Sequence, residues 1–278
     1  MEPNYQNDNY NNMQSNGQSG YPQNPQNSNP YGYQTNYNGY NNGTRSGGFG
    51  VGNIGDAFSE AAEALRQKVV AQAFIFMMAA LVITAIGAKV ASDVLLSWME
   101  KSPAVLILLL VAEIAIVIGS NVALKKNNVV LTASLYTVYS FINGATLGII
   151  CMAYVETSVT RVFVITAAMF VVTAFYGLVS KKDLTSIGGF CFMGLIGLIV
   201  AGVVNLFLKS TALDFLFSIV GVVVFVGLTA YDTKKIKERA AYADSSNVTA
   251  IALSGAFQLY LDFVNLFLYL LKLFGKRR

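Results

Sequence analysis

The chain has 278 residues, of which 54% are hydrophobic and only 12% are charged. A soluble domain of this length would need roughly twice that charged fraction, so the composition excludes an ordinary soluble protein. The formal net charge is only +4, and the lysines and arginines lie mainly in short segments between apolar runs. We therefore interpret them as topology signals and expect no nucleic-acid partner.

Cysteine and histidine usage removes further classes of protein. Cys151 and Cys191 both lie within apolar segments, without a partner at the spacing of a disulfide framework or a zinc site. The chain contains no histidine, which excludes a Ser–His protease and most general-base chemistry. No glycine-rich phosphate-binding loop precedes a helix. We therefore expect no enzyme and no cofactor.

Residues 1–52 differ in composition from the rest of the chain. They are rich in Asn, Gln, Tyr, Gly and Ser, and they hold four of the five prolines: Pro3, Pro22, Pro25 and Pro30. Such a segment cannot bury enough apolar surface to offset its ordering entropy, so we predict a disordered N-terminal tail that acts as a flexible tether. A partner-binding or clustering role is the alternative. A signal peptide is excluded because no basic region leads directly into an apolar one.

Residues 53–278 are predicted to form an all-α, seven-transmembrane-helix domain. An amphipathic approach, Ile54 to Gln67, precedes apolar spans long enough to cross a bilayer core of about 30 Å. Pro103 begins the second span, where its missing N–H costs least, and Trp98 lies in the interfacial belt. The predicted spans are 69–91, 103–124, 129–153, 159–179, 187–208, 212–232 and 250–274.

Basic residues are concentrated in alternate loops, which predicts a cytoplasmic N-terminus. The segments on that side carry Arg66, Lys68, Lys125, Lys126, Lys181, Lys182, Lys234, Lys235, Lys237 and Arg239, and the outer loops carry Lys89, Lys101, Arg161 and Lys209. Seven full crossings put the C-terminus outside, although Lys276, Arg277 and Arg278 oppose this. A re-entrant last span, with the C-terminus inside, is the alternative. The compact loops favour a bacterial inner membrane.

Acidic residues inside the predicted spans are the strongest functional signal. A carboxylate at mid-bilayer costs on the order of 2.5–3.5 kcal/mol, so it usually faces a partner or a wet cavity. Three acids meet this description: Glu113, Asp232 and Asp262.

Polar side chains form a continuous stripe on the last span, which predicts that this helix lies at the centre of the bundle. The stripe comprises Ser254, Gln258, Asp262, Asn265, Tyr269 and Lys272. A shorter stripe follows the third span: Thr132, Tyr136, Tyr139, Asn143 and Thr146. Gly144 and Gly148 beside it permit close helix approach. Such stripes more often hold helices together than form a transport path, so the functional interpretation depends on the carboxylates.

Asp232 and Asp262 are the acids best placed to act together. At ~1.5 Å per residue, Asp262 lies roughly 10–18 Å below the cytoplasmic surface and Asp232 lies near it, which leaves contact between them open. If they meet in a low dielectric, one retains a proton near neutral pH. The pair would then be a pH-sensitive site for H⁺ or Ca²⁺, because carboxylate oxygens are hard ligands.

Two segments resemble the signatures of a known family. Gly227–Lys237 (GLTAYDTKKIK) looks like the end of the sixth helix in the transmembrane Bax inhibitor motif family, and Gly255–Phe267 (GAFQLYLDFVNLF) is similar to its seventh-helix signature. The resemblance covers about Phe58 to the C-terminus. It implies a seventh helix wrapped by the other six, and a Ca²⁺ leak pathway gated by protonation of two aspartates, which map onto Asp232 and Asp262.

The resemblance also implies supporting residues and an alternative function. Family members pair an acid on the second helix with a base late on the seventh, and Glu113 and Lys272 occupy those places. A basic residue that latches the aspartates in some members would be Lys125 or Lys126, although lysine cannot reproduce a bidentate fork. The alternative is a non-transporting regulator of stress, cell death or a membrane protease, with a membrane-protein partner bound through the tail or loops. A retinal protein is disfavoured because Lys272 lies near the helix end.

Overall fold

The computed structural model describes residues 51–99, 104–126 and 128–278, and these residues fold as a bundle of seven α-helices. The tail predicted for residues 1–52 lies outside the described part, except for its last two residues, which begin the first helix. The helices are α1 (Val51–Met99), α2 (Ala104–Lys125), α3 (Val129–Met152), α4 (Glu156–Val179), α5 (Thr185–Leu208), α6 (Thr211–Ala240) and α7 (Val248–Phe274). Each is long and apolar enough to cross a membrane, and the chain is a multi-pass integral membrane protein.

The helices extend beyond several of the predicted spans. The amphipathic approach and the first span form one continuous helix, α1, whose side chains from Asp56 to Ala64 are all exposed. The helix α6 likewise continues past the predicted end at residue 232 to Ala240. Pro103 and the Trp98 side chain lie outside the described part. Hydropathy therefore located every span but underestimated the length of those helices that continue beyond the apolar segment.

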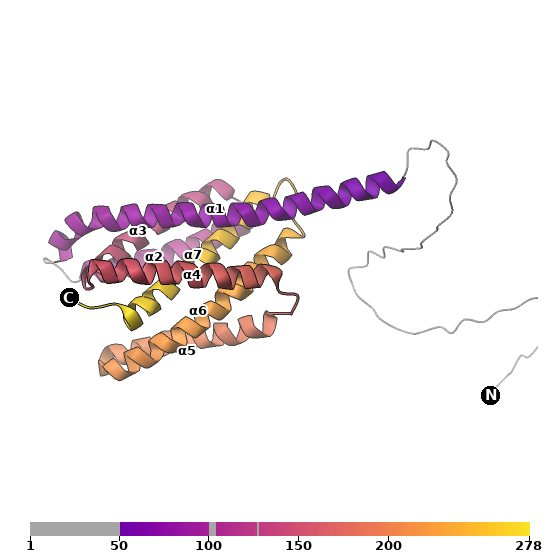
Figure 1. Cartoon of the computed structure of the whole chain (residues 1–278). Coiled ribbons are helices and arrows are strands. Elements are labelled where there is room, and N and C mark those ends of the chain that lie inside the picture. The colour runs from indigo at the N-terminus through magenta and orange to yellow at the C-terminus, as the bar shows by residue number, and fades with distance from the viewer. Residues whose placement is uncertain (1–50, 100–103, 127) are drawn as a thin grey trace, which may run out of the picture. The chain divides into compact units, whose positions relative to one another are not determined.

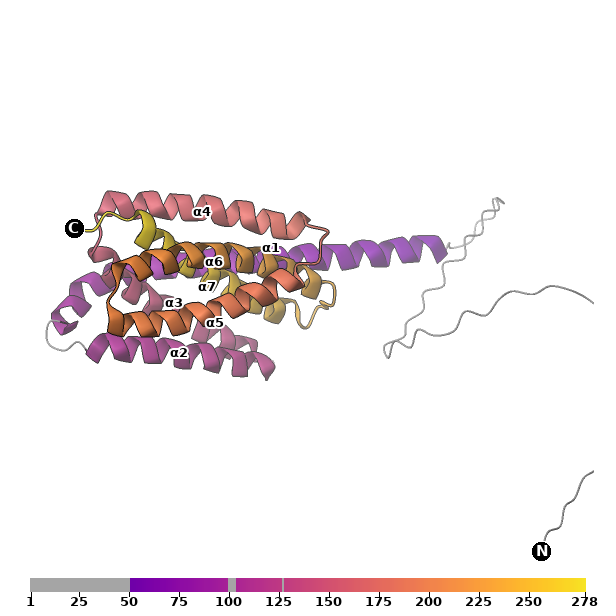
Figure 2. The ribbon, with the colours of Figure 1, turned by 90° about the horizontal axis from the view of Figure 1, so that it is seen from below.

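The helix α7 lies at the centre of the bundle, as the polar stripe predicted (Figures 1 and 2). It packs against α6, α1, α4 and α3, and more than half of its residues are buried. The six other helices do not share this contact equally: α2 packs mainly on α3, and α5 packs on α6. The two outer helices therefore form a second layer, and the wrapping by all six that the resemblance implied is uneven.

Close approach of α1 and α3 depends on the two glycines that the sequence analysis noted. A Cβ atom at Gly144 would lie 2.8 Å from the Thr84 carbonyl carbon, and one at Gly148 would lie 2.6 Å from the Ala88 carbonyl oxygen. The third-span stripe faces inward as predicted, because Thr132, Tyr136, Tyr139, Asn143 and Thr146 are all buried.

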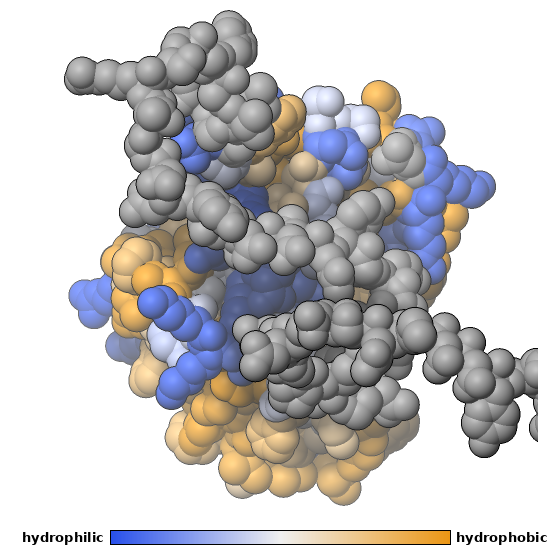
Figure 3. Space-filling model, turned by 90° about the vertical axis from the view of Figure 1, so that its right-hand side faces the viewer, coloured by the Kyte–Doolittle hydropathy of each residue, from blue (hydrophilic) through white to orange (hydrophobic). Residues whose placement is uncertain are grey.

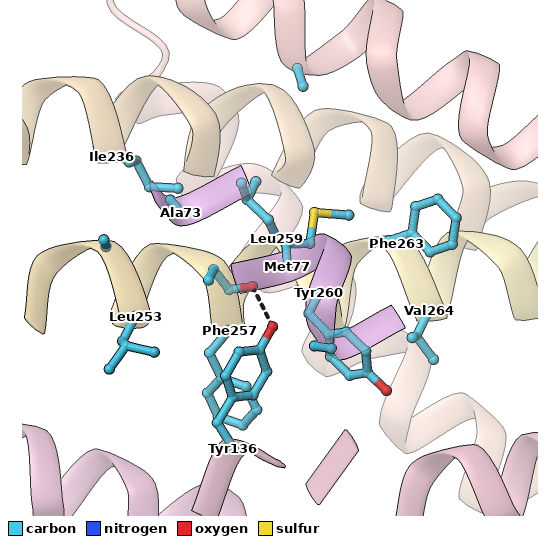
Figure 4. Close-up of a cluster of buried hydrophobic side chains, with 14 of the residues drawn as sticks. Ala73, Met77, Tyr136, Ile236, Leu253, Phe257, Leu259, Tyr260, Phe263 and Val264 are labelled. Atoms are coloured by element: carbon cyan, nitrogen blue, oxygen red, sulfur yellow. Dashed lines mark hydrogen bonds between the residues drawn. The ribbon is translucent and has the colours of Figure 1, made fainter. Parts of the chain in front are cut away.

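Aromatic side chains fill the interface between α3 and α7. The rings of Tyr136 and Tyr139 meet those of Phe257 and Tyr260 edge to face, with centroids 5.1–5.9 Å apart. The Tyr136 hydroxyl donates to the Ala256 carbonyl oxygen at 3.2 Å (Figure 4). The Tyr136 hydroxyl is thus paired within the protein, as a membrane interior requires.

The C-terminal residues return to the connection between α3 and α4. Val155 N–H donates to the Lys276 carbonyl at 2.8 Å, and Arg278 N–H donates to the Ala153 carbonyl at 3.0 Å. The helix α7 is one uninterrupted helix, so the chain ends where α3 ends and α4 begins. This geometry agrees with seven full crossings and not with a re-entrant last span.

The opposite end of the bundle carries the α4–α5 and α6–α7 connections. Seen from that end, hydrophilic residues gather in groups, and hydrophobic residues follow the lower edge (Figure 3). Hydrogen bonds order the α6–α7 connection: Asp244 Oδ1 accepts from the Ser246 hydroxyl at 2.6 Å and from the Asn247 N–H at 3.0 Å. These bonds hold the pKa of Asp244 below its usual value, and the bond from the Ser246 hydroxyl has the largest effect. They also fix the turn between α6 and α7.

Candidate functional site

A cavity of about 480 Å³ lies among α5, α6 and α7, and both Asp232 and Asp262 line it. The Asp262 side chain on α7 is buried, with 4% of its surface exposed, and Asp232 on α6 is half-buried. The structure thus brings together the two aspartates whose contact the sequence left open. The two carboxyl groups are close enough to share a hydrogen bond if one of them carries a proton.

Three members of the α7 stripe share this cavity. Gln258 and Asn265 lie one turn to either side of Asp262, and all three line it because residues three or four apart share a helix face. The remaining members do not line it. The Tyr269 ring stacks on Phe225 at 5.7 Å, and Lys272 is exposed, with its ammonium 5.6 Å from the Tyr269 ring centroid. The stripe therefore divides into a cavity-lining half and a half outside the cavity that includes Ser254.

Two buried oxygen atoms in this cavity have no hydrogen-bond donor among the described residues. They are Asp262 Oδ2 and Gln258 Oε1. Buried acceptors are normally paired, and an unpaired one costs about 1–3 kcal/mol. A proton shared with Asp232, a water molecule or a bound cation would satisfy them. Both atoms are acceptors, so the group that pairs with them must be a hydrogen-bond donor or a cation.

The cavity also contains a cation that the sequence analysis placed only among the topology signals. Lys235 lines it, with its ammonium 4.9 Å from the centroid of the Tyr231 ring. The sequence spacing could have indicated this position, because Lys235 lies one helical turn after Asp232 and on the same face of α6. Its neighbours face other partners: Lys234 lies 3.8 Å from Glu238, and Lys237 donates to the Leu178 carbonyl at 2.7 Å.

Lys125 and Lys126, the candidate latch residues, are not near this cavity. Both are exposed at the end of α2, and α2 packs against α3 and α1, whereas the aspartates lie on α6 and α7. Of the basic residues in the described part, the one that lines the cavity is Lys235. The structure therefore does not support a latch formed by α2.

Glu113 belongs to a second buried network, away from Lys272. Its carboxylate accepts from the Thr146 hydroxyl at 2.7 Å and from Asn143 Nδ2 at 3.3 Å. Asn143 Oδ1 in turn accepts from the Tyr260 hydroxyl at 3.0 Å, which lies 2.6 Å from the Thr84 hydroxyl. No ion pair joins Glu113 to Lys272 in the described part of the chain. The network links α2, α3, α7 and α1 through neutral partners.

Two members of that network, Thr84 and Tyr260, were not predicted from the sequence. Tyr260 lies off the polar stripe of α7, and Thr84 is an isolated polar residue in an apolar span, so periodicity gave no reason to join them. Tyr260 is nevertheless completely buried, and a buried tyrosine hydroxyl usually needs a partner. The need for such a partner could have indicated from the sequence that Tyr260 belongs to a polar network.

No cluster of three or more Asp, Glu, Cys or His side chains able to hold a metal ion exists among the described residues. Cys191 is buried and Cys151 is half-buried, and both are free thiols. The site around Asp232 and Asp262 therefore offers two carboxylates and the amide oxygens of Gln258 and Asn265. Such a set is small compared with the six to eight oxygens around a tightly bound Ca²⁺.

Comparison with known proteins agrees with the signatures on α6 and α7. The family described as "Inhibitor of apoptosis-promoting Bax1" matches residues 66–278. The chain is 40% identical to the inner membrane protein YbhL of Escherichia coli strain K12 over 217 residues, which cover 76% of this chain and 93% of YbhL. It is 36% identical to an uncharacterized protein of Borreliella burgdorferi over 218 residues, 77% of this chain and 94% of that protein. An uncharacterized membrane protein of Streptococcus pyogenes is 34% identical over 166 residues, 60% of this chain and 72% of that protein. The chain belongs to the Bax inhibitor family of membrane proteins.

Proposed function

We propose that the protein is a pH-sensitive Ca²⁺ leak channel in which Asp232 and Asp262 form the gate. The observation that supports this most directly is the cavity among α5, α6 and α7, where both carboxyl groups lie with two unpaired buried oxygens. A membrane protein gains no stability by keeping such groups unsatisfied. A role that uses them, in taking up H⁺ or a cation, accounts for their presence.

The gating mechanism follows from the closeness of the two carboxyl groups. Two carboxylates in a low dielectric do not both ionise easily, so the pair holds one proton and titrates as a unit. While the proton is shared, α6 and α7 are joined through it and the cavity attracts divalent cations weakly. When the proton leaves, the two negative charges repel each other and attract Ca²⁺.

The small number of oxygen ligands favours passage over storage. Ca²⁺ prefers six to eight oxygens at 2.3–2.6 Å, and this cavity supplies two carboxylates and two side-chain amides. Water molecules would complete the shell, so the ion is held loosely. An ion-conducting site must bind weakly enough to release its ion, which this ligand set allows without an enzymatic step or a cofactor.

We further propose that the protein lies in the inner membrane of a bacterium, with its N-terminus in the cytoplasm. The similar protein YbhL is named as an inner membrane protein. Lys181, Lys182 and the lysines near the end of α6 belong to the same end of the bundle as the start of α1, and basic residues concentrate on the cytoplasmic side.

Flux measurements with matched aspartate variants test the channel. Purified protein in liposomes loaded with a Ca²⁺ indicator should admit Ca²⁺, and Asp262→Asn should reduce this flux several-fold at the pH of maximal wild-type flux. Asp214→Asn is the control, because Asp214 is exposed in the first turn of α6 and pairs with Asn205 at 2.8 Å. Flux no greater than in protein-free liposomes would contradict the channel and favour the regulator.

A further inference from the structure

A second cavity, of about 700 Å³, lies between α1 and α4 and shares no residue with the cavity of the two aspartates. Side chains of α7, among them Phe263, Val264 and Phe267, line it together with the end of α3. Its volume is within the range of small-molecule sites, roughly 300–1,000 Å³. Nothing in the proposed channel mechanism uses it.

The cavity is apolar along its length and charged at one end. Leu81, Phe163 and Phe263 line its inner part, and Lys89, Glu156 and Arg278 line its outer part. On α1 the lining extends from Leu81 to Lys89, which corresponds to ~12 Å of helix. Because α1 ends, α4 begins and α7 ends on this side of the bundle, the charged end lies toward a membrane surface. An apolar slot with a charged mouth at that depth has the polarity of a phospholipid.

The charged mouth is held in place by the backbone. The bridge between Tyr154 and Arg277 and the bonds of Lys276 and Arg278 to the α3–α4 connection fix the C-terminal residues. Successive side chains of an extended segment point in opposite directions. Arg277 accordingly lies over the Tyr154 ring, 5.9 Å from its centroid, whereas Arg278 lines the cavity.

We propose that this cavity binds one phospholipid whose headgroup carries a primary ammonium, such as phosphatidylethanolamine. The acyl chain would occupy the slot between α1 and α4. The phosphate would be bound by the Arg278 guanidinium, which suits phosphate geometry, and the headgroup ammonium would donate to the Glu156 carboxylate. A headgroup without an ammonium would give Glu156 no hydrogen-bond donor, even though Lys89 and Arg278 at the same mouth attract its phosphate, and a quaternary ammonium cannot donate the hydrogen bond either.

The proposal is independent of ion conduction, so its test uses binding alone. Full-length protein purified in a mild detergent and freed of co-purified lipid would be titrated with phosphatidylethanolamine, phosphatidylcholine or phosphatidylglycerol. Native mass spectrometry counts the lipids bound. We expect one phosphatidylethanolamine to bind about tenfold more tightly than either other lipid, since charge-assisted hydrogen bonds differ by this order.

Variants at the mouth and in the slot separate this site from general lipid contact. Arg278→Gln should weaken binding about tenfold, and Glu156→Gln should remove the preference for phosphatidylethanolamine over phosphatidylcholine. Arg277→Gln is the matched control and should bind as the wild type does. Ala85→Phe fills the slot from the exposed face of α1 and should abolish the tight binding of one phosphatidylethanolamine.

Equal binding of all three lipids by the wild type would mean that only non-specific lipid contacts exist. Unchanged binding in Ala85→Phe would mean that the lipid lies elsewhere on the surface. Equal loss in Arg277→Gln and Arg278→Gln, with retained helix content by circular dichroism, would mean that the C-terminal residues act through their general charge and not through this cavity.

Discussion

At the scale of single residues, Lys235 is the cation that shares a cavity with Asp232 and Asp262. A positive charge beside two carboxylates repels an approaching Ca²⁺, and such charges interact by a few kcal/mol at an effective dielectric of about 20. Partial solvation of Lys235 reduces this effect. We predict that Lys235→Gln lowers the half-saturating Ca²⁺ concentration for flux by roughly three- to tenfold, measured in proteoliposomes.

Lys234→Gln is the matched control for that measurement. Lys234 is the adjacent residue, but its ammonium lies 3.8 Å from Glu238 and it does not line the cavity. The control should therefore leave the half-saturating concentration near the wild-type value. An equal change in both variants would indicate a general surface-charge effect and would contradict the role assigned to Lys235.

Tyr260 is the second residue whose contribution can be isolated. Its hydroxyl joins Thr84 on α1 to Asn143 on α3, and Tyr260→Phe removes both bonds while keeping the ring. Hydrogen bonds between transmembrane helices contribute about 0.6 kcal/mol on average, with a maximum near 1.7. We predict a loss of about 1 kcal/mol in the free energy of unfolding, measured by titration with sodium dodecyl sulfate.

Tyr139→Phe provides the comparison. The Tyr139 ring packs on the same Phe257 and Tyr260 rings, but its hydroxyl makes no hydrogen bond to another described residue. This variant should change the unfolding free energy by less than half as much. A loss in Tyr139→Phe as large as that in Tyr260→Phe would contradict the importance of the Thr84–Tyr260–Asn143 connection.

At the scale of helices, periodicity predicted which residues of α7 share a face but not what lies opposite that face. Gln258, Asp262 and Asn265 could be grouped from their spacing. Lys272 could not be paired correctly, because a helical stripe more than four turns long faces different neighbours along its length. Glu113 is bound by α3 residues, and that partnership depends on the rotation of α2, which its nearly uniform apolar sequence does not specify.

The contact between α1 and α3 gives a prediction at this scale. A methyl group at Gly144 would overlap the Thr84 backbone, and backbone cannot move aside as a flexible side chain can. Gly144→Ala should therefore destabilise the protein by about 1–3 kcal/mol, the usual cost of overpacking, measured as a lower thermal unfolding midpoint in detergent.

Gly202→Ala on α5 is the matched substitution. No atom outside its own helix lies within 4 Å of the position of the new methyl group. Because alanine restricts the unfolded chain more than glycine does, this variant should be neutral or more stable by up to about 1 kcal/mol. If both alanine variants unfold at the wild-type midpoint, the close approach of α1 and α3 is not a packing constraint.

At the scale of the whole molecule, composition and hydropathy sufficed for the class of protein and for all seven spans. The central position of α7 also followed from sequence, because a helix with a polar stripe cannot face lipid along its whole length. The second-layer positions of α2 and α5 did not follow, since both helices are apolar over most of their surface and have no continuous polar stripe. The cavity beside α4 was equally hidden, because it is formed by α1, α3, α4 and α7 together.

If Asp232 and Asp262 form a proton-operated gate, Ca²⁺ flux must depend on pH through these two residues. Flux into proteoliposomes would be measured from about pH 6 to about pH 8, a range in which a closely coupled carboxyl pair can titrate. The proteins would be the wild type, Asp232→Asn/Asp262→Asn and the control Asp214→Asn. We expect flux that varies with pH in the wild type and the control and is independent of pH in the double variant. A double variant whose flux follows the wild-type pH profile would contradict the gate, and Asp232 and Asp262 would then be structural residues that join α6 to α7.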